Sequence, residues 1–250
     1  MALRYVPLIK PGDDLATIIL ETLENNQITL HDNDILVLAQ KIVSKAENQY
    51  RFLSQVTPSQ RALELSLICR KDPALIELIL QESQDVIRVK PNVLIVEHRL
   101  GFISANAGID QSNVKQDSVE NADRVLLLPK NPDLSAARIR TSLEKVSNKK
   151  LGVMVIDSHG RPWRLGTMGT TIGLSGVPGV IDMRGIQDMF GYELQYTEVA
   201  VADELAAAAS LVMGQAAEAQ PIVHVRDFPY QLSDGNLKEI IRPKEFDLFR

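Results

Sequence analysis

Two acidic segments of the chain each follow an apolar run and carry one aspartate. The first comprises residues 106–113 and contains Asp110; the second comprises residues 157–164 and begins with Asp157, directly after the apolar residues 151–156. We expect both segments to be short loops at strand ends. Carboxylate, amide and hydroxyl oxygens suit a hard metal ion such as magnesium, which can also carry phosphate. Such a site would serve a nucleotide-using enzyme, whereas two Asx-turns would explain the same residues equally well.

Basic residues near these segments could bind phosphate or carboxylate groups. Lys45 closely follows an apolar strand, so it either faces a phosphate site or is an ordinary solvated lysine. Arg161 and Arg164 flank a Pro-Trp pair in the second acidic segment. They either recognise an anionic substrate or belong to an exposed loop. His159 is close to Asp157 in the sequence but receives no catalytic role, because no nucleophilic triad accompanies it.

The bulk composition argues against several classes of protein. The 250 residues are 45% hydrophobic, enough for a sizeable core, and the net charge of −5 argues against a general nucleic-acid binder. The single cysteine, Cys69, permits no intramolecular disulfide, and its apolar neighbours predict a buried helix position. The scattered histidines form no zinc pattern. We see no signal peptide and no bilayer-spanning stretch, so we expect a cytoplasmic protein with no membrane partner.

Apolar periodicity and turn residues predict the elements that must position these groups. Helices are expected from Leu15 after a turn at 11–14, after an N-cap at Thr57, after Asp72-Pro73, and over 133–149 and 200–213. Strands are expected at 34–39, 86–89, 93–96, 102–105, 125–129, 151–156, 192–199 and 221–225, with 5–9 a strand or an extended entry.

This element order favours an α+β fold with mixed or antiparallel sheets and peripheral helices, because the strands cluster without regular βαβ alternation. The sequence contains no P-loop motif and no Rossmann glycine motif, so neither of those nucleotide sites is supported. We expect a single domain over residues 1–250, with a peripheral polar tail from about residue 227.

A set of ordered motifs resembles the coenzyme F420-0:γ-glutamyl ligase family. The similarity covers nearly the whole chain, and several motifs in order are far more specific than any one of them. The matching segments are residues 6–9 with 11–14, 40–47, 106–113, 157–164, 182–185, 190–194, and 201–209 with 213–214.

The resemblance implies a GTP-dependent ligase that joins L-glutamate to a deazaflavin acceptor, coenzyme F420-0, through an acyl phosphate. Further glutamates would follow through γ-linkages. It also implies an intertwined homodimer with GTP bound near the subunit interface. The implied ions are Mg²⁺ or Mn²⁺, at up to two sites, and a monovalent cation such as K⁺.

The family match also assigns site residues. Asp110 and Asp157 are implied ligands of one divalent ion, and Ser158 would contact a second. Arg161 and Arg164 remain candidates for binding the substrate. The nucleotide would be lined by Val6, Pro7, Leu8, Ile9, Gln40, Lys41, Lys45, Asn113, Met213, Gly214, Gln215, Ala216, Ala217, Glu218, Ala219 and Gln220.

Some positions depart from the family pattern. No glycine follows Gly214 in residues 215–220, Asn48 stands where relatives normally have glycine, and Tyr192 replaces a usual arginine. Ser158 stands where threonine is usual. These departures leave two alternatives open: a γ-glutamyl ligase of a folate- or pterin-like acceptor, and a non-catalytic nucleotide-binding paralogue.

Overall fold

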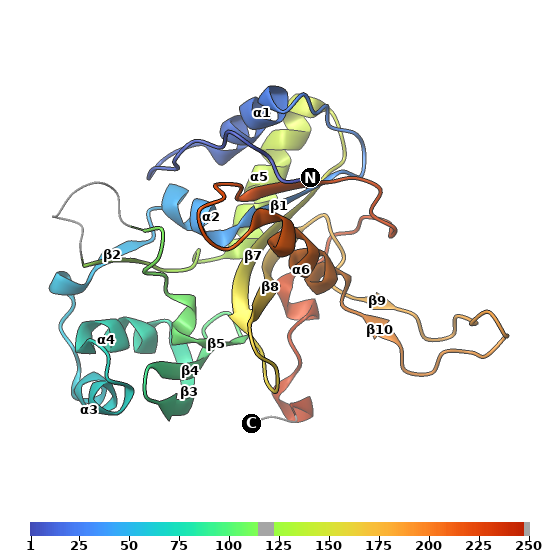
Figure 1. Ribbon diagram of the computed structural model, residues 1–250. Coiled ribbons are helices and arrows are strands. Elements are labelled where there is room, and N and C mark those ends of the chain that lie inside the picture. The colour runs from blue at the N-terminus through green and yellow to red at the C-terminus, as the bar shows by residue number, and fades with distance from the viewer. Residues whose placement is uncertain (115–122, 248–250) are drawn as a thin grey trace.

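The computed structural model describes residues 1–114 and 123–247. Its centre is a four-stranded mixed sheet in the order β11-β1-β7-β8 (Figure 1). These strands are β11 (Ile222–Val225), β1 (Ile35–Ala39), β7 (Gly152–Gly160) and β8 (Thr167–Ser175). Strands β1 and β7 are parallel, whereas β11 and β8 pair antiparallel to their neighbours. The mixed α+β architecture agrees with the sequence prediction.

Helices cover both faces of the central sheet, which explains why β1 and β7 are almost continuously apolar. Leu36, Leu38 and Val153 face a core shared with α1 (Leu15–Asn25) and α5 (Pro132–Ser147). The alternate residues Val37 and Met154 face a second core shared with α6 (Val201–Met213). The period-two alternation of a strand therefore distributes each apolar run between two helical layers.

A second group of elements packs below the sheet in the view of Figure 1. It contains α3 (Gln60–Cys69), α4 (Pro73–Gln81), β3 (Ser83–Lys90) and β4 (Val93–His98), which share their own apolar core, and β5 (Ile103–Ala105), which pairs with β4. The short ribbon of β2 (Tyr50–Phe52) and β6 (Arg124–Leu126) connects this group to the sheet. Cys69 is fully buried at the end of α3, as predicted.

The hairpin of β9 (Ile181–Asp182) and β10 (Glu198–Val199) carries residues 183–197 away from the body as a projecting arm (Figure 1). Only Glu198 and Val199 of the expected strand over 192–199 pair in a sheet. In the C-terminal segment, which we expected to be peripheral, the 3₁₀ turn Leu237–Glu239 places Leu237 in the α6 core. No helix among the described residues is long and apolar enough to cross a bilayer.

Several predicted boundaries need correction. Helix α3 is capped by Ser59 rather than Thr57, because the Ser59 hydroxyl accepts from Ala62 N and its own N–H donates to Glu77 on α4. Residues 5–9 form no strand, and Tyr5 has a φ of +66°, which is not an extended conformation. The second acidic segment is not a loop at its start, because residues 157–160 continue β7 and pair with β8.

Candidate functional site

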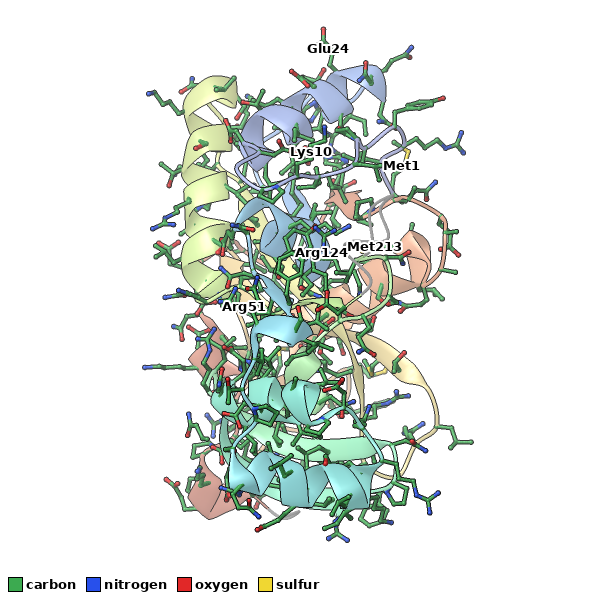
Figure 2. The ribbon with its side chains drawn as sticks, turned by 90° about the vertical axis from the view of Figure 1, so that its left-hand side faces the viewer. Met1, Lys10, Glu24, Arg51, Arg124 and Met213 are labelled. Atoms are coloured by element: carbon green, nitrogen blue, oxygen red, sulfur yellow. The ribbon has the colours of Figure 1, made fainter. Side chains whose placement is uncertain are left out.

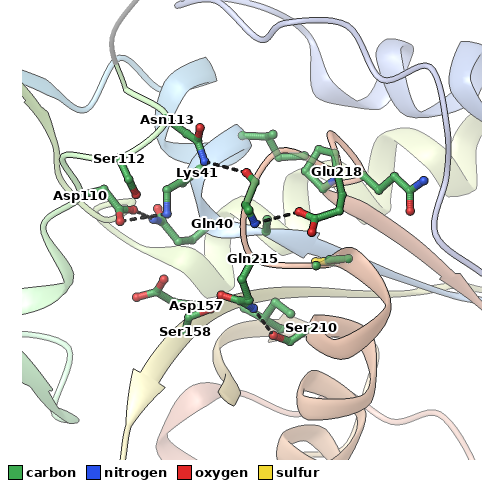
Figure 3. A pocket seen from close by; sticks show the side chains of 18 of the residues that line it. Gln40, Lys41, Asp110, Ser112, Asn113, Asp157, Ser158, Ser210, Gln215 and Glu218 are labelled. Atoms are coloured by element: carbon green, nitrogen blue, oxygen red, sulfur yellow. Dashed lines mark hydrogen bonds and ion pairs between the residues drawn. The ribbon is translucent and has the colours of Figure 1, made fainter. Parts of the chain in front are cut away.

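A pocket of about 740 Å³ opens at the carboxyl ends of the parallel strands β1 and β7. Ala39 and Ile156 are the last pair between β1 and β7, so the next residues, Gln40 at the start of α2 and Asp157 within β7, follow at the same end of that pairing. Helix α2 (Gln40–Ala46) begins there, and the segment after α6 closes another side. The sheet topology thus brings together residues that are far apart in the sequence (Figure 3).

Asp110 reaches this pocket from the segment after the 3₁₀ turn Asn106–Gly108. Its backbone exchanges two 2.9 Å hydrogen bonds with Leu126 of β6, which fixes its position. Its carboxylate accepts from Gln40 and lies 2.9 Å from Lys41 Nζ. Burial raises the pKa of Asp110 to about 6 although Lys41 acts in the opposite direction, and the nearby charge of Asp157 adds to the rise.

Asp157 lies on β7 with His159 two residues later on the same strand face. His159 Nε2 is 3.1 Å from Asp157 Oδ2, and Phe102 packs against the His159 ring at 5.1 Å between ring centroids. Burial acts to raise the pKa of Asp157, but the contact with His159 and the Ser158 backbone N–H bring it below its ordinary value. Asp157 is therefore held as a carboxylate facing Asp110 (Figure 3).

The segment over residues 213–220 is held in place by a series of polar contacts (Figure 3). Ser158 Oγ donates to Gln215 Oε1 at 2.9 Å, and Gln215 Nε2 donates to Ser210 Oγ of α6 at 2.8 Å. On the other side, Asn113 Nδ2 donates to Ala216 O at 3.2 Å. These bonds join the first acidic segment, β7 and the 213–220 segment around one cavity.

Two of the departures noted in the sequence, Asn48 and the missing glycine in residues 215–220, fall at positions with a left-handed backbone. Gly214 has φ +76° and ψ 177°, and a Cβ there would overlap the Glu218 side chain, so the position requires glycine. Ala219 adopts φ +55° and Asn48 φ +54°, the left-handed region that glycine favours. Asparagine tolerates that region better than alanine, so Asn48 is an adequate substitute whereas Ala219 is strained.

Lys41 and Lys45 supply positive charge on the α2 side of the pocket. Lys41 is paired with Asp110, whereas Lys45 forms no ion pair with any residue that the structure describes. Burial lowers the pKa of Lys45, and the positive charges of Lys41 and Arg124 lower it further. This side of the pocket is therefore suited to an anionic ligand.

The structure brings nearly all of the predicted site residues together. Every residue expected to line the nucleotide lies on this pocket, as do Asp110, Asp157 and Ser158. Arg161 and Arg164 do not line it; Arg161 is in the turn between β7 and β8, where Nη1 lies 3.4 Å from Gly166 O. Tyr192, on the projecting arm, also lies outside the pocket lining.

Some lining residues were not predicted. Ser112, Thr167 and Ser210 contribute hydroxyl groups to the pocket. Ser210 could have been found, because it is a polar residue of the Ala-rich helix α6 one turn before Gly214. Thr167 could not, since it reaches the pocket only through its pairing with Gly160 across the β7–β8 hairpin.

The oxygen donors at the centre of the pocket are few. Among the described residues no cluster of three or more His, Cys, Asp or Glu side chains could by itself hold a metal ion. Asp110 and Asp157 provide two carboxylates, with Ser158 and Gln215 oxygens nearby. An all-oxygen set with few carboxylates matches magnesium or manganese that takes further ligands from phosphate.

Comparison with known proteins identifies the family. A family model described as F420-0:Gamma-glutamyl ligase matches residues 4–227. The chain belongs to the F420-0:γ-glutamyl ligase family. The matched region of this family member contains the whole pocket described above, including the 213–220 segment.

Relatives of this F420-0:γ-glutamyl ligase family member are similar over almost their entire length. The chain is 44% identical to the coenzyme F420:L-glutamate ligase of Methanococcus maripaludis, covering 98% of this chain and 94% of that protein. It is 44% identical to the protein of that name from Methanothermobacter thermautotrophicus, covering 98% and 96%. The Archaeoglobus fulgidus protein is 38% identical, covering 98% and 93%.

Proposed function

We propose that this protein is a GTP-dependent ligase that adds L-glutamate to the deazaflavin precursor coenzyme F420-0 and then extends it through γ-linkages. Family membership and the names of its relatives support the glutamate ligation. The observation that carries the proposal is the pocket in which Asp110 and Asp157 face each other beside Lys41 and Lys45. A negatively charged nucleotide with a divalent ion complements this combination of charges.

Each wall of the pocket has a role in this proposal. Residues 6–9 and 213–220 would enclose the nucleotide, and Lys41 and Lys45 would contact its phosphates. Asp110 and Asp157 would hold Mg²⁺ or Mn²⁺, and Ser158 with Gln215 would contact a second ion. When bound, the divalent ion would offset the negative charge of the phosphates. We also propose that the protein binds a monovalent cation such as K⁺.

A carboxylate is a poor electrophile, so amide formation requires its activation. In the proposed first step an oxygen of the acceptor carboxylate forms a bond to the γ-phosphorus while the bond between that phosphorus and the β–γ bridging oxygen breaks, releasing GDP. In the second step the neutral amine of glutamate bonds to the acyl carbon, the carbon–oxygen bond to phosphate breaks, and one proton passes from the nitrogen to solvent. Catalysis of this kind depends on positioning and electrostatics. The lysines would therefore stabilise the phosphate charge, and no protein nucleophile is needed.

We also propose that the protein forms the intertwined homodimer implied by the resemblance. The projecting arm supports this, because it exposes large apolar side chains that a second copy could cover. Met189 and Phe190 are 88% and 87% exposed, and Tyr196 is 91% exposed. The arm extends away from the body of the chain (Figure 1).

The proposal is tested by incubating the purified protein with GTP, L-glutamate and one acceptor at a time. The acceptors are coenzyme F420-0 and a folate, and the products are read by mass spectrometry. We expect glutamyl additions to coenzyme F420-0 that require GTP, with GDP released in equal amount. Addition only to the folate would replace the acceptor assignment. GTP binding without addition to either acceptor would favour the non-catalytic paralogue.

A further inference from the structure

Arg124 and Tyr50 form a fixed pair on the β2–β6 ribbon, next to the pocket. The antiparallel register places Phe52 opposite Arg124 and Tyr50 opposite Leu126, so Tyr50 is the diagonal neighbour of Arg124 on the same face. The guanidinium carbon lies 4.1 Å from the centroid of the Tyr50 ring. Stacking on an aromatic face holds the guanidinium plane in one orientation.

Both side chains have unused hydrogen-bonding capacity in a buried position. Arg124 Nη2 donates to Val114 O at 2.8 Å, whereas its buried Nε has no partner among the described residues. The Tyr50 hydroxyl, on a side chain that is nine-tenths buried, also has none there. Buried polar groups without partners are rare, because desolvation costs free energy that no bond repays. A bound anionic oxygen would satisfy both groups.

The positive charges of Arg124 and Lys45 are only partly compensated, because Asp110 acts on Lys45 without forming an ion pair with it. No carboxylate among residues 1–114 and 123–247 forms an ion pair with Arg124 or Lys45, whereas Lys41 is paired with Asp110. The charges of Arg124 and Lys45 lie close enough to interact, and Lys45 lines the pocket. Two nearby cations that form no ion pair repel each other, and an anion bound between them would remove this repulsion.

We propose that Arg124, Lys45 and the Tyr50 hydroxyl form an anion subsite beside the pocket, reached through Lys45, that binds a carboxylate or phosphate group of a substrate. This subsite rests on the proposed ligase function only for the three molecules that could supply the anionic group: GTP, L-glutamate and the acidic acceptor. The planar guanidinium suits a two-oxygen group, since it can donate two parallel hydrogen bonds. Arg124 and Tyr50 therefore contribute to substrate binding outside the expected nucleotide lining.

Arg51 provides a matched control. It is the neighbour of Tyr50 on β2 and points to the opposite face of the strand, where Nη1 donates to Tyr50 O at 2.7 Å. Figure 2 shows Arg51 and Arg124 at mid-height, between α1 above and α3 below. Arg51→Gln removes the same charge from the same ribbon; the bond it loses is to the Tyr50 backbone carbonyl, so the Tyr50 hydroxyl and the Arg124 guanidinium are left in place.

The test measures the Kd of GTP and the KM values of L-glutamate and coenzyme F420-0 for Arg124→Gln, Arg124→Lys, Tyr50→Phe and Arg51→Gln. We expect Arg124→Gln to raise at least one constant about tenfold or more, with Arg124→Lys intermediate because it keeps charge without the planar fork. Tyr50→Phe should raise the same constant about threefold through loss of one hydrogen bond. Arg51→Gln should change none. The constant that rises identifies the source of the anion.

Two results would overturn the subsite: all three constants staying within about twofold of wild type in folded Arg124→Lys and Tyr50→Phe proteins, or equal effects of Arg51→Gln and Arg124→Gln. Melting temperatures report folding, and the two conservative variants carry the test if Arg124→Gln unfolds. If the wild type adds no glutamate, the proposed function fails separately. Calorimetric titration with inorganic pyrophosphate, L-glutamate and coenzyme F420-0 then tests the subsite without turnover, by the same comparison of variants.

Discussion

Lys41 Nζ lies 2.9 Å from Asp110 Oδ1, so a carboxylate proposed as a metal ligand is paired with a lysine of the same pocket. Gln40 also donates to this carboxylate. A divalent ion that binds Asp110 must therefore compete with Lys41. On binding, Lys41 would be released toward the phosphates of the nucleotide, which couples the two ligands through one ion pair.

The competition predicts opposite effects of one substitution on the two ligands. Lys41→Met should raise Mn²⁺ affinity without nucleotide about fivefold, the factor for roughly 1 kcal/mol of lost competition in a partly exposed pair. The same variant should bind GTP more weakly. Calorimetric titration at pH 8, above the Asp110 pKa of about 6, checks both. Asp110→Asn is the control and should abolish Mn²⁺ binding both in the otherwise wild-type protein and in the Lys41→Met variant. Weaker Mn²⁺ binding by Lys41→Met would contradict the competition.

The backbone of the 213–220 segment gives a second prediction. Ala219→Gly should relieve the strain of φ +55° and raise the free energy of unfolding by about 1 kcal/mol. Gly214→Ala should distort the segment, because its φ of +76° and the adjacent Glu218 leave no room for a Cβ, and GTP affinity should fall. Denaturant unfolding and GTP titration measure these effects. If Gly214→Ala binds GTP as tightly as the wild type, the 213–220 segment does not contribute to nucleotide binding.

The buried carboxylate of Asp34 predicts a pH dependence of stability. It accepts from Arg226 at 2.8 and 3.0 Å and lies 2.8 Å from His224 Nε2. Burial acts to raise its pKa, but Arg226 and His224 hold the pKa at about 2, below the ordinary 3.8. The lowered pKa of Asp34 therefore contributes about 2 kcal/mol to the free energy of unfolding above pH 4. This contribution is lost as the pH falls through about 2.

Asp34→Asn should accordingly lower the free energy of unfolding at pH 7 by about 2 kcal/mol, and by less in acid. Denaturant unfolding at several pH values measures the difference. Asp32→Asn is the control, since Asp32 is exposed and accepts from Lys150 N. An Asp34→Asn effect that does not change between pH 7 and pH 2 would assign the loss to packing rather than to the carboxylate charge.

The projecting arm predicts how the dimer can be disrupted. Light scattering should give twice the chain mass for the wild type and a monomer for the double variant Met189→Ser, Phe190→Ser, because the apolar contact area is lost. Leu67→Ser removes a similarly exposed apolar side chain from α3 and should leave the dimer intact. A monomeric wild type would reject the homodimer, and a dimeric double variant would place its interface elsewhere.

Local sequence signals predicted much of the fold. Asp14 and Asp72 cap the helices expected after them, and the apolar runs over 34–39 and 151–156 form the central parallel strands. Thr57 and Ser59 are both competent caps; Ser59 is the one whose hydroxyl accepts from Ala62 N and whose N–H donates to Glu77 of α4, a contact that the local sequence does not predict. Residues 157–160 read as a loop because their strand character comes from pairing with β8.

The sequence predicts the candidate site mainly from its ordered motifs. Their sequence context points to Asp110 and Asp157, but only the parallel pairing of β1 with β7 and the bridge to Leu126 bring them to one pocket. Arg124 gave no sequence signal, because its relation to Tyr50 depends on strand pairing across more than seventy residues. Arg161 and Arg164, which local context alone predicts as substrate ligands, do not line the pocket.

The most direct test of the central claim compares wild type with Asp157→Asn in one reaction mixture of coenzyme F420-0, L-glutamate, GTP and Mn²⁺. We expect the wild type to form glutamylated product and GDP in equal amounts. Asp157→Asn should keep the wild-type melting temperature and lose at least about a hundredfold in rate, since one of two carboxylates for the metal is gone. GTP-dependent glutamylation by Asp157→Asn at the wild-type rate would contradict the account.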